Sequence, residues 1–208
     1  LNEGIVRVGV SETALHEVLL PALVKYHALY PKIKFSLINL TNAQAIGAVK
    51  NQAVDFALIA TPFDEDKTLK TVTIKTFQDI VVCGKRYKYL TSEKVGFEEI
   101  LKHCVISLNK TTKTYEYYFN LFRRRGLNFS PDIEVSTSNQ ILPIVKNNLG
   151  IGFVPESFAE KEIADGEVFK LETEEEIAPR EICLIKRKDF SLSVAAKELE
   201  SVLKTIAE

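Results

Sequence analysis

Several features of specialised proteins are missing from this sequence of 208 residues. It contains no methionine, and it begins with Leu1. No apolar run approaches the roughly 20 residues that a membrane-spanning helix needs, and the first residues do not resemble a signal peptide. We therefore expect a cytoplasmic protein without a membrane partner, whose translation start lies upstream of this chain.

Cysteine is scarce and histidine is scattered. The three cysteines are widely spaced in apolar, strand-like surroundings, which favours buried free thiols in a reducing compartment; a redox-sensing pair is the alternative. They are Cys83, Cys104 and Cys183. The histidines share no metal-ligand spacing and are typical of surface or interface positions. They are His16, His27 and His103. We expect neither a metal nor a cofactor.

The sequence also lacks a marked excess of positive or negative charge. The formal net charge is −1, which argues against nucleic acid as a partner of this chain itself. The one basic cluster, Arg123–Arg125, precedes Gly126 at the end of an amphipathic segment. Positive charge and glycine both suit a helix C-terminus, so a structural role competes with phosphate binding there.

The stretch from Gly4 to Thr61 organises the chain. An apolar run over 5–10 ends in small polar residues and is followed by helical periodicity, the pattern of a buried parallel strand that leads into a helix. Ser11 and Thr13 stand at this corner, where unpaired backbone N–H groups can hold an anion or a polar ligand.

The helix after this corner carries more apolar surface than one buried face requires. Leu20 and Val24 lie outside its main apolar stripe. Either the helix is deeply buried, or a second face packs against another subunit. Pro21 is unfavourable in a helix interior, so we expect it in a first turn or a kink, with the ordered helix beginning near Leu19.

Two further strands end in the same way. The segment 32–38 alternates apolar and polar residues and leads to Thr41 and Asn42, which we expect to cap a helix. The apolar run 55–60 is typical of a central parallel strand and ends at Thr61. Ligands bind outside the carboxyl ends of such strands, so these corners predict one wall of a binding site.

The second half repeats this plan. The predicted strand 104–108 leads to Asn109 and Thr111, and the strand 131–135 ends at Ser136. A glycine-rich strand, 149–155, ends at Pro155, and Ser138 is a candidate helix N-cap. The acidic run Glu174–Glu176 is interpreted as a solvated loop.

A final strand, 182–185, and a final helix, 192–206, need a sheet to pack on. The economical arrangement returns them to the first half, so the chain would cross between two lobes near 76–79 and 178–182. We predict an α/β fold with 1–77 plus 180–208 as the first lobe and 78–179 as the second, joined by two crossover strands that form a hinge.

Taken in order, these motifs resemble the effector-binding domain of LysR-type transcriptional regulators. They are Gly9 with the Ser/Thr corner, Leu19–Pro21, Tyr30–Pro31, Asn39–Gln44, Asp55–Leu58 and Leu149–Pro155. The resemblance runs along essentially the whole chain. It implies two Rossmann-like lobes of the type 2 periplasmic-binding-protein kind, a small-molecule effector between them, and a homodimer through the first long helix. It also implies tetramers in the full-length protein and a winged helix-turn-helix domain, absent from this chain, that would bind DNA.

The resemblance also implies a set of effector-binding residues from both lobes. They are Ser11, Thr13, Thr41, Asn42, Thr61, Asn109, Thr111, Ser136, Phe153 and Pro155. No arginine is expected in these corners, so an anionic effector would depend on hydroxyls, backbone N–H groups and Lys110. Helix capping alone is the alternative explanation for Ser11, Thr41 and Ser138, but the convergence of several such corners favours a site.

Two other functions fit the same fold. A solute-binding receptor of a transporter would normally carry a secretion signal or a lipid-anchor cysteine. An enzyme would need catalytic motifs, and the sequence has no nucleophile elbow, no clustered Cys/His ligands and no glycine-rich phosphate loop. We therefore predict a regulator rather than an enzyme, with an effector that the sequence does not identify.

Overall fold

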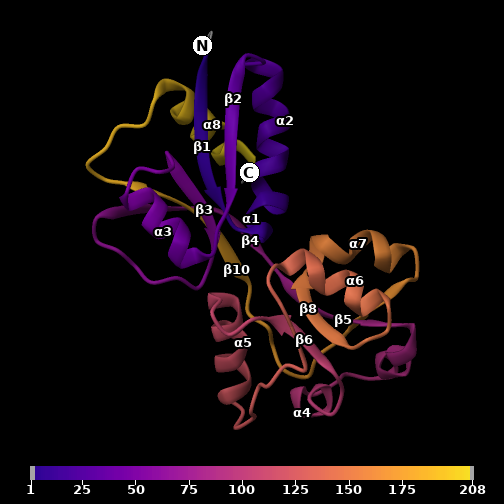
Figure 1. Ribbon diagram of the computed structural model, residues 1–208. Helices are drawn as coiled ribbons and strands as arrows, with labels where there is room; N and C mark the ends of the chain where they lie inside the picture. The colour runs from indigo at the N-terminus through magenta and orange to yellow at the C-terminus, as the bar shows by residue number, and fades with distance from the viewer. Residues whose placement is uncertain (1–2, 207–208) are drawn as a thin grey trace. The chain divides into compact units, whose positions relative to one another are not determined.

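The computed structural model describes residues 3–206 and divides them into two compact α/β units (Figure 1). Unit 2 is Phe77–Pro179, and unit 1 is the described chain on either side of it. The crossings fall where the sequence predicted them, except that Phe77 belongs to unit 2. Each unit contains one five-stranded sheet.

The sheet of unit 1 has the order β2-β1-β3-β10-β4. β1 pairs in parallel with β2 and β3, and β10 inserts antiparallel to β3. Every residue of β3 is buried, as its continuous apolar sequence predicted. The strands are Gly4–Val10 (β1), Ile33–Asn39 (β2), Phe56–Ala60 (β3), Leu69–Phe77 (β4) and Arg180–Arg187 (β10).

The helical segment after β1 starts earlier than predicted. It comprises α1 (Glu12–Ala14), a π-helical turn η1 (Leu15–Leu19) and α2 (Leu20–Leu29). Pro21 lies in the first turn of α2 and Leu19 is the N-cap of α2, both as expected, but further helical turns precede this helix. The π turn, in which Leu20 N donates to Leu15 O, carries the helical backbone up to the proline.

Helices cover both faces of this sheet. On one face, α2 packs against α8 (Val194–Ile206), and the buried Tyr26 hydroxyl donates to Ala195 O at 3.0 Å. On the other face, α3 (Asn42–Lys50) contributes Ala45 and Val49 to a core cluster with β3. The chain's tail therefore completes unit 1, as predicted.

The sheet of unit 2 has the order β7-β6-β8-β5-β9. Its plan repeats that of unit 1: β6 is parallel to β7 and β8, and β5 inserts antiparallel to β8. β9 is an edge strand. The strands are Asp79–Gly84 (β5), Val105–Leu108 (β6), Ile133–Val135 (β7), Ile151–Pro155 (β8) and Val168–Leu171 (β9).

Two helices of unit 2 were not predicted from the sequence, the 3₁₀ helix η2 (Lys85–Ser92) and α7 (Glu156–Ala164). The other helices of unit 2 include α4 (Phe97–Ile100), α5 (Lys113–Arg123) and α6 (Ile141–Lys146), which follows the 3₁₀ turn η3 (Ser138–Gln140). The N-cap of η3 is Thr137 rather than Ser138, because Thr137 forms a capping box with Gln140.

The core of unit 2 is aromatic on one face of its sheet and aliphatic on the other. The rings of Phe97 and Phe122 stack at 4.4 Å, and Phe153 lies 4.6 Å from Tyr118. On the opposite face, α6 approaches β8 so closely that a Cβ on Gly152 would lie 2.5 Å from the Ile141 side chain. This close contact explains the glycine in β8.

The cysteines are free, as the sequence indicated, and Cys83 and Cys183 are buried. Burial raises the pKa of the Cys83 thiol to about 11 and raises the pKa of Cys183 as well. Both groups are therefore protonated near neutral pH. In residues 3–206, no helix has both the length and the apolar character needed to cross a membrane.

A buried carboxylate joins α8 to β10. Glu200 is 6% exposed and accepts hydrogen bonds from Lys186 Nζ at 2.6 Å and Lys204 Nζ at 2.8 Å. Burial alone would raise its pKa, but the hydrogen bonds from the two lysines outweigh burial, and the net pKa is lowered. Ionised Glu200 therefore stabilises the folded state.

We predict that Glu200→Gln lowers the free energy of unfolding at pH 7 by about 1–3 kcal/mol, between the values for surface and buried pairs. Because the folded pKa is lowered, the stabilisation is complete above the ordinary glutamate pKa and is lost as pH falls through the folded value. Urea denaturation at pH 7 and at progressively lower pH should show the two proteins converging. A constant difference at all pH values would contradict this origin.

Candidate functional site

The polar strand ends of unit 1 meet at one edge of its sheet. We call Ser11, Thr13, Thr41, Asn42 and Thr61 the unit 1 edge. They follow β1, β2 and β3, which are neighbours in the sheet. Ser11 N donates to Leu58 O, and Leu40 N donates to Val10 O, each at 3.0 Å. The sequence prediction that these three corners lie together is correct.

Several of these side chains also stabilise the local fold. Ser11 Oγ accepts from Ala14 N, and Thr41 forms a capping box with Gln44 at the start of α3. Asn42 Nδ2 donates to Ala60 O at 2.8 Å and to Pro62 O at 3.0 Å. Helix capping thus accounts for part of the pattern, and the amide of Asn42 binds the turn after β3.

Thr61 joins this edge to the strand that returns from unit 2. Its hydroxyl accepts from Glu181 N at 3.0 Å, and its carbonyl accepts from Arg180 Nε at 2.7 Å. Arg180 is only 4% exposed. The sequence expectation that no arginine lies among these corners is therefore wrong, because antiparallel pairing of β10 with β3 brings Arg180 beside Thr61.

A carboxylate also occupies the unit 1 edge. Glu12 begins α1 and accepts a hydrogen bond from Asn39 Nδ2 at 2.8 Å, and its other oxygen lies 3.0 Å from His16 Nε2. The residues predicted for this edge from the sequence did not include Glu12. Its position directly after Ser11 was the available signal.

The strand ends of unit 2 also share an edge. We call Asn109, Thr111, Ser136 and Pro155 the unit 2 edge. Asn109 N donates to Val135 O at the end of β7, and Asn109 Oδ1 accepts from Thr111 N at 3.1 Å. The amide of Ser136 is held by Gln140 Oε1 at 3.0 Å. Asn109 and Thr111 follow β6, Ser136 follows β7 and Pro155 ends β8, and these three strands are adjacent in the sheet.

The remaining predicted residue, Phe153, has a structural position. It is 3% exposed, and its ring packs among Tyr118, Phe122 and Phe129 in the core of unit 2. Pro155 is buried as well. Lys110, expected as a possible anion contact, is exposed and lies 3.8 Å from Glu134.

Other chemistry at these edges is limited. Within the described residues there is no group of three His, Cys, Asp or Glu side chains placed to hold a metal ion. Glu175, from the acidic run that was interpreted as a solvated loop, accepts from Phe97 N at 2.9 Å and so supports the start of α4. The polar groups at the two edges are mainly hydroxyls and amides, together with the Glu12 carboxylate and the buried Arg180 beside Thr61.

Comparison with known proteins identifies this arrangement. The family model of the LysR substrate binding domain matches residues 1–207. The chain belongs to the LysR substrate binding domain family. This membership confirms the predicted resemblance and places the chain among LysR-type regulators rather than among the solute-binding receptors of transporters.

The curated proteins whose sequences are similar to this chain include HTH-type transcriptional regulators. The HTH-type transcriptional regulator YoaU of Bacillus subtilis is 24% identical over 99% of this chain and 68% of its own length. YfeR of Shigella flexneri is 20% identical over 97% of this chain and 64% of its own length. The chain thus spans about two thirds of these regulators.

Solved structures confirm the predicted two-lobed fold. The regulatory domain of CcmR from Synechocystis, solved with 2-PG, superposes with a TM-score of 0.87 at 19% identity, covering 99% of this chain and 98% of that one. The effector binding domain of QuiR, solved with shikimate, gives a TM-score of 0.84 at 16% identity with the same coverage.

The tie between Thr61 and β10 can be tested directly. In Thr61→Val the amide of Glu181 loses its hydroxyl acceptor, so we expect its hydrogen exchange to accelerate and the free energy of unfolding to fall by about 1 kcal/mol. Thr61→Ser retains the hydroxyl and should behave like the wild type. Unchanged exchange at Glu181 in the valine variant would contradict the tie.

Proposed function

We propose that this domain binds a small polar effector through residues of the unit 1 edge and of the unit 2 edge, and that binding regulates transcription by a cytoplasmic LysR-type protein. The observation that carries the proposal is the repeated plan: both units end adjacent parallel strands in hydroxyl and amide residues. Family membership supports it, as does the binding of 2-PG by CcmR and shikimate by QuiR.

The lining groups favour an effector rich in hydrogen-bonding oxygen. Ser11, Thr41, Asn109 and Thr111 offer neutral donors and acceptors, whereas Glu12 disfavours anionic groups near its own corner. A multiply charged anion would need its charge placed away from Glu12. We therefore propose a hydroxylated metabolite with at most one acidic group.

Signalling would act through the crossings between the units. A ligand that contacts both edges stabilises the arrangement of the units in which both contacts are made. Thr61 is bonded to the first residues of β10, so a ligand there would also bias the second crossing. In the full-length protein this change would reach the DNA-binding part through the oligomer.

A thermal-shift screen with shikimate, 2-PG and a panel of sugars and hydroxy acids tests the effector site. A ligand present at about 100 times its Kd should add roughly 2.7 kcal/mol, or about 5–10 °C in Tm for a protein of this size. Thr13→Val in unit 1 and Thr111→Val in unit 2 should each abolish the shift, because each removes one hydroxyl from the proposed site.

The matched control is Thr71→Val, an exposed threonine on β4 outside both edges. It should keep the full shift. Both site variants should lie within about 1 kcal/mol of the wild type without ligand. A ligand whose shift survives both site substitutions binds elsewhere, and that result would reject the proposed site.

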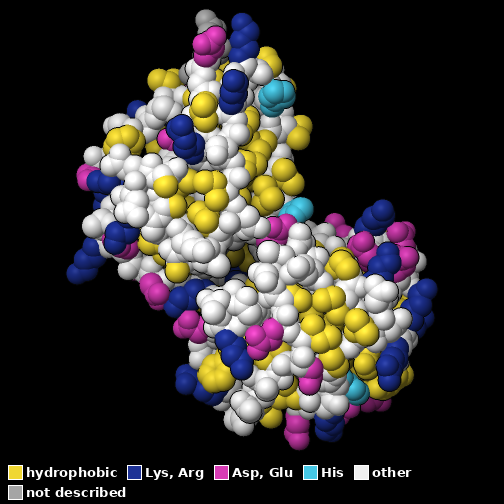
Figure 2. All heavy atoms as spheres, viewed as in Figure 1, with side chains coloured by type: hydrophobic (Ala, Val, Ile, Leu, Met, Phe, Trp, Pro, Cys, Tyr) yellow, Lys and Arg dark blue, Asp and Glu magenta, His cyan; other side chains and the backbone are white. Residues whose placement is uncertain are grey.

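Dimerisation is the second part of the proposal. Apolar residues are exposed along α2 and the neighbouring edge strand β2: Leu20, Val24, Leu29, Leu37 and Ile38. Val24 is 74% exposed. Figure 2 shows apolar side chains gathered on the face of unit 1 where Figure 1 places these elements. A second copy of the same surface would bury them in a two-fold contact.

We predict that Val24→Glu converts the dimer to a monomer in light scattering after size-exclusion chromatography, since a charge would be buried in the contact. Leu149→Glu places the same charge on another exposed apolar residue, in unit 2, and should leave the dimer intact. Equal behaviour of the two variants would place the dimer contact elsewhere.

A further inference from the structure

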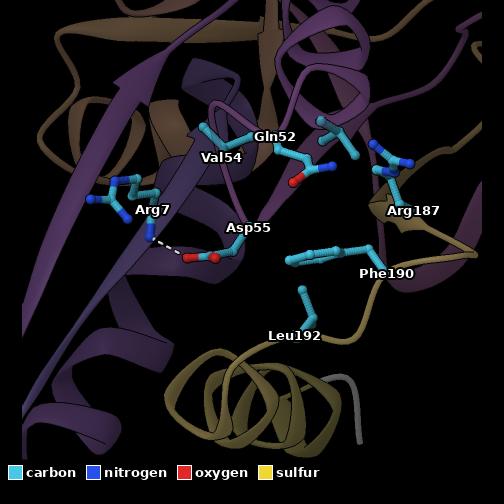
Figure 3. Close-up of a pocket in the computed structure, with 8 residues that line it drawn as sticks. Arg7, Gln52, Val54, Asp55, Arg187, Phe190 and Leu192 are labelled. Atoms are coloured by element: carbon cyan, nitrogen blue, oxygen red, sulfur yellow. Dashed lines mark hydrogen bonds between the residues drawn. The ribbon is translucent and has the colours of Figure 1, made fainter.

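Unit 1 contains a cavity that the proposed effector site does not use. It has a volume of about 210 Å³ and lies where the end of α3, the start of β3 and the β10–α8 loop meet (Figure 3). Its lining includes Gln52, Asp55, Arg187, Phe190 and Leu192. Asp55 precedes β3 and Thr61 follows it, so at about 3.3 Å per residue the cavity is roughly 20 Å from the unit 1 edge.

The polar groups of the cavity leave an acceptor available. Asp55 Oδ2 accepts from Arg7 N at 2.7 Å, and no described residue pairs with Oδ1. Arg187 makes two hydrogen bonds to Asp189 and one to Lys50 O, so its charge is neutralised locally. Figure 3 shows the Arg7 guanidinium turned away from the other lining side chains. The carboxylate of Asp55 thus has no charged side-chain partner among residues 3–206, and the Arg7 guanidinium, which likewise has none, points away from the other lining side chains.

Gln52 adds a second polar group at a conformational cost. Its φ is 57°, in the left-handed region that glycine or asparagine usually occupies after a helix. Ala53 N closes the helix end by donating to Ala48 O. Glycine would adopt this backbone conformation with less strain. Gln52 occupies the position instead and lines the cavity, and its side chain makes no hydrogen bond to the described residues. Its amide can donate to or accept from a bound molecule.

The rest of the lining is apolar. Val49, Val54 and Leu192 are buried, and the ring of Phe190 is 47% exposed. In Figure 3 the ring lies above Leu192, with its edge toward Asp55. A volume of about 210 Å³ corresponds to roughly seven waters at about 30 Å³ each, enough for a small metabolite.

We propose that this cavity binds a small organic cation, a primary amine on a short aromatic or apolar body. The ammonium group would donate to Asp55 Oδ1 and to the Gln52 amide oxygen. The body would pack on Phe190 and on the apolar floor of Val54 and Leu192. This site is separate from the proposed effector site and does not depend on it.

The probe is benzylamine, titrated into the ¹⁵N-labelled domain, with benzyl alcohol as its uncharged counterpart and benzoate as an anion. We expect saturable amide shifts confined to residues 49–55 and 187–192, with benzylamine binding at least tenfold more tightly than benzyl alcohol. Benzoate should bind more weakly than either. Shifts confined instead to residues 11–13 or 109–111 would assign the amine to the effector edges and overturn this proposal.

Variants identify the groups responsible. Asp55→Asn keeps an acceptor for Arg7 N but removes the charge, so the tenfold preference for the amine should disappear. Gln52→Gly should weaken binding several-fold without lowering Tm, because glycine suits the left-handed backbone. Asp165→Asn, an exposed carboxylate in unit 2, is the control and should bind like the wild type. Wild-type affinity in Asp55→Asn, or no saturable binding at residues 49–55, would overturn the proposal.

Discussion

The antiparallel insertion of one strand into each otherwise parallel sheet is the constraint on which the rest of this structure depends. β10 lies between β3 and β4, and β5 lies between β8 and β9. Each inserted strand begins within two residues of a crossing between the units. Sheet hydrogen bonds therefore anchor both crossings. Gln78 strengthens the first, since its side chain donates to Asp79 O and Ile177 O.

This constraint also determines what a ligand at the strand ends can influence. The hydroxyl and carbonyl of Thr61 bond to Glu181 and Arg180, so the end of β3 and the start of β10 move together. Lys75, near the other crossing, forms a 2.6 Å ion pair with the buried Glu17 of the π turn. Both crossings are thus bonded to elements that carry the unit 1 edge. Coupling requires such a physical connection between a ligand and the part that moves.

Local sequence patterns were sufficient for the strands and their polar ends, because alternation, apolar runs and capping residues are properties of short segments. These patterns predicted that Thr41 caps α3 and that the final strand and helix belong to unit 1. They missed α7, because Ala159 is its only buried residue and its apolar signal is weak. They also missed Arg180 beside Thr61, and the family resemblance implied an effector contact for Phe153, whose ring lies in the core of unit 2. Those positions depend on pairing between distant strands, which no local pattern contains.

The discontinuity of unit 1 has a consequence for synthesis on the ribosome. Unit 2 is one continuous segment and can complete its sheet while later residues are still being added. Unit 1 is synthesised first, but its sheet lacks β10 until Arg180–Arg187 leave the ribosome. Until then β3 and β4 each have a backbone edge without its β10 hydrogen bonds. Domains usually fold from the N-terminal end during translation. Here unit 2 can complete its sheet before unit 1 does, because the sheet of unit 1 includes β10.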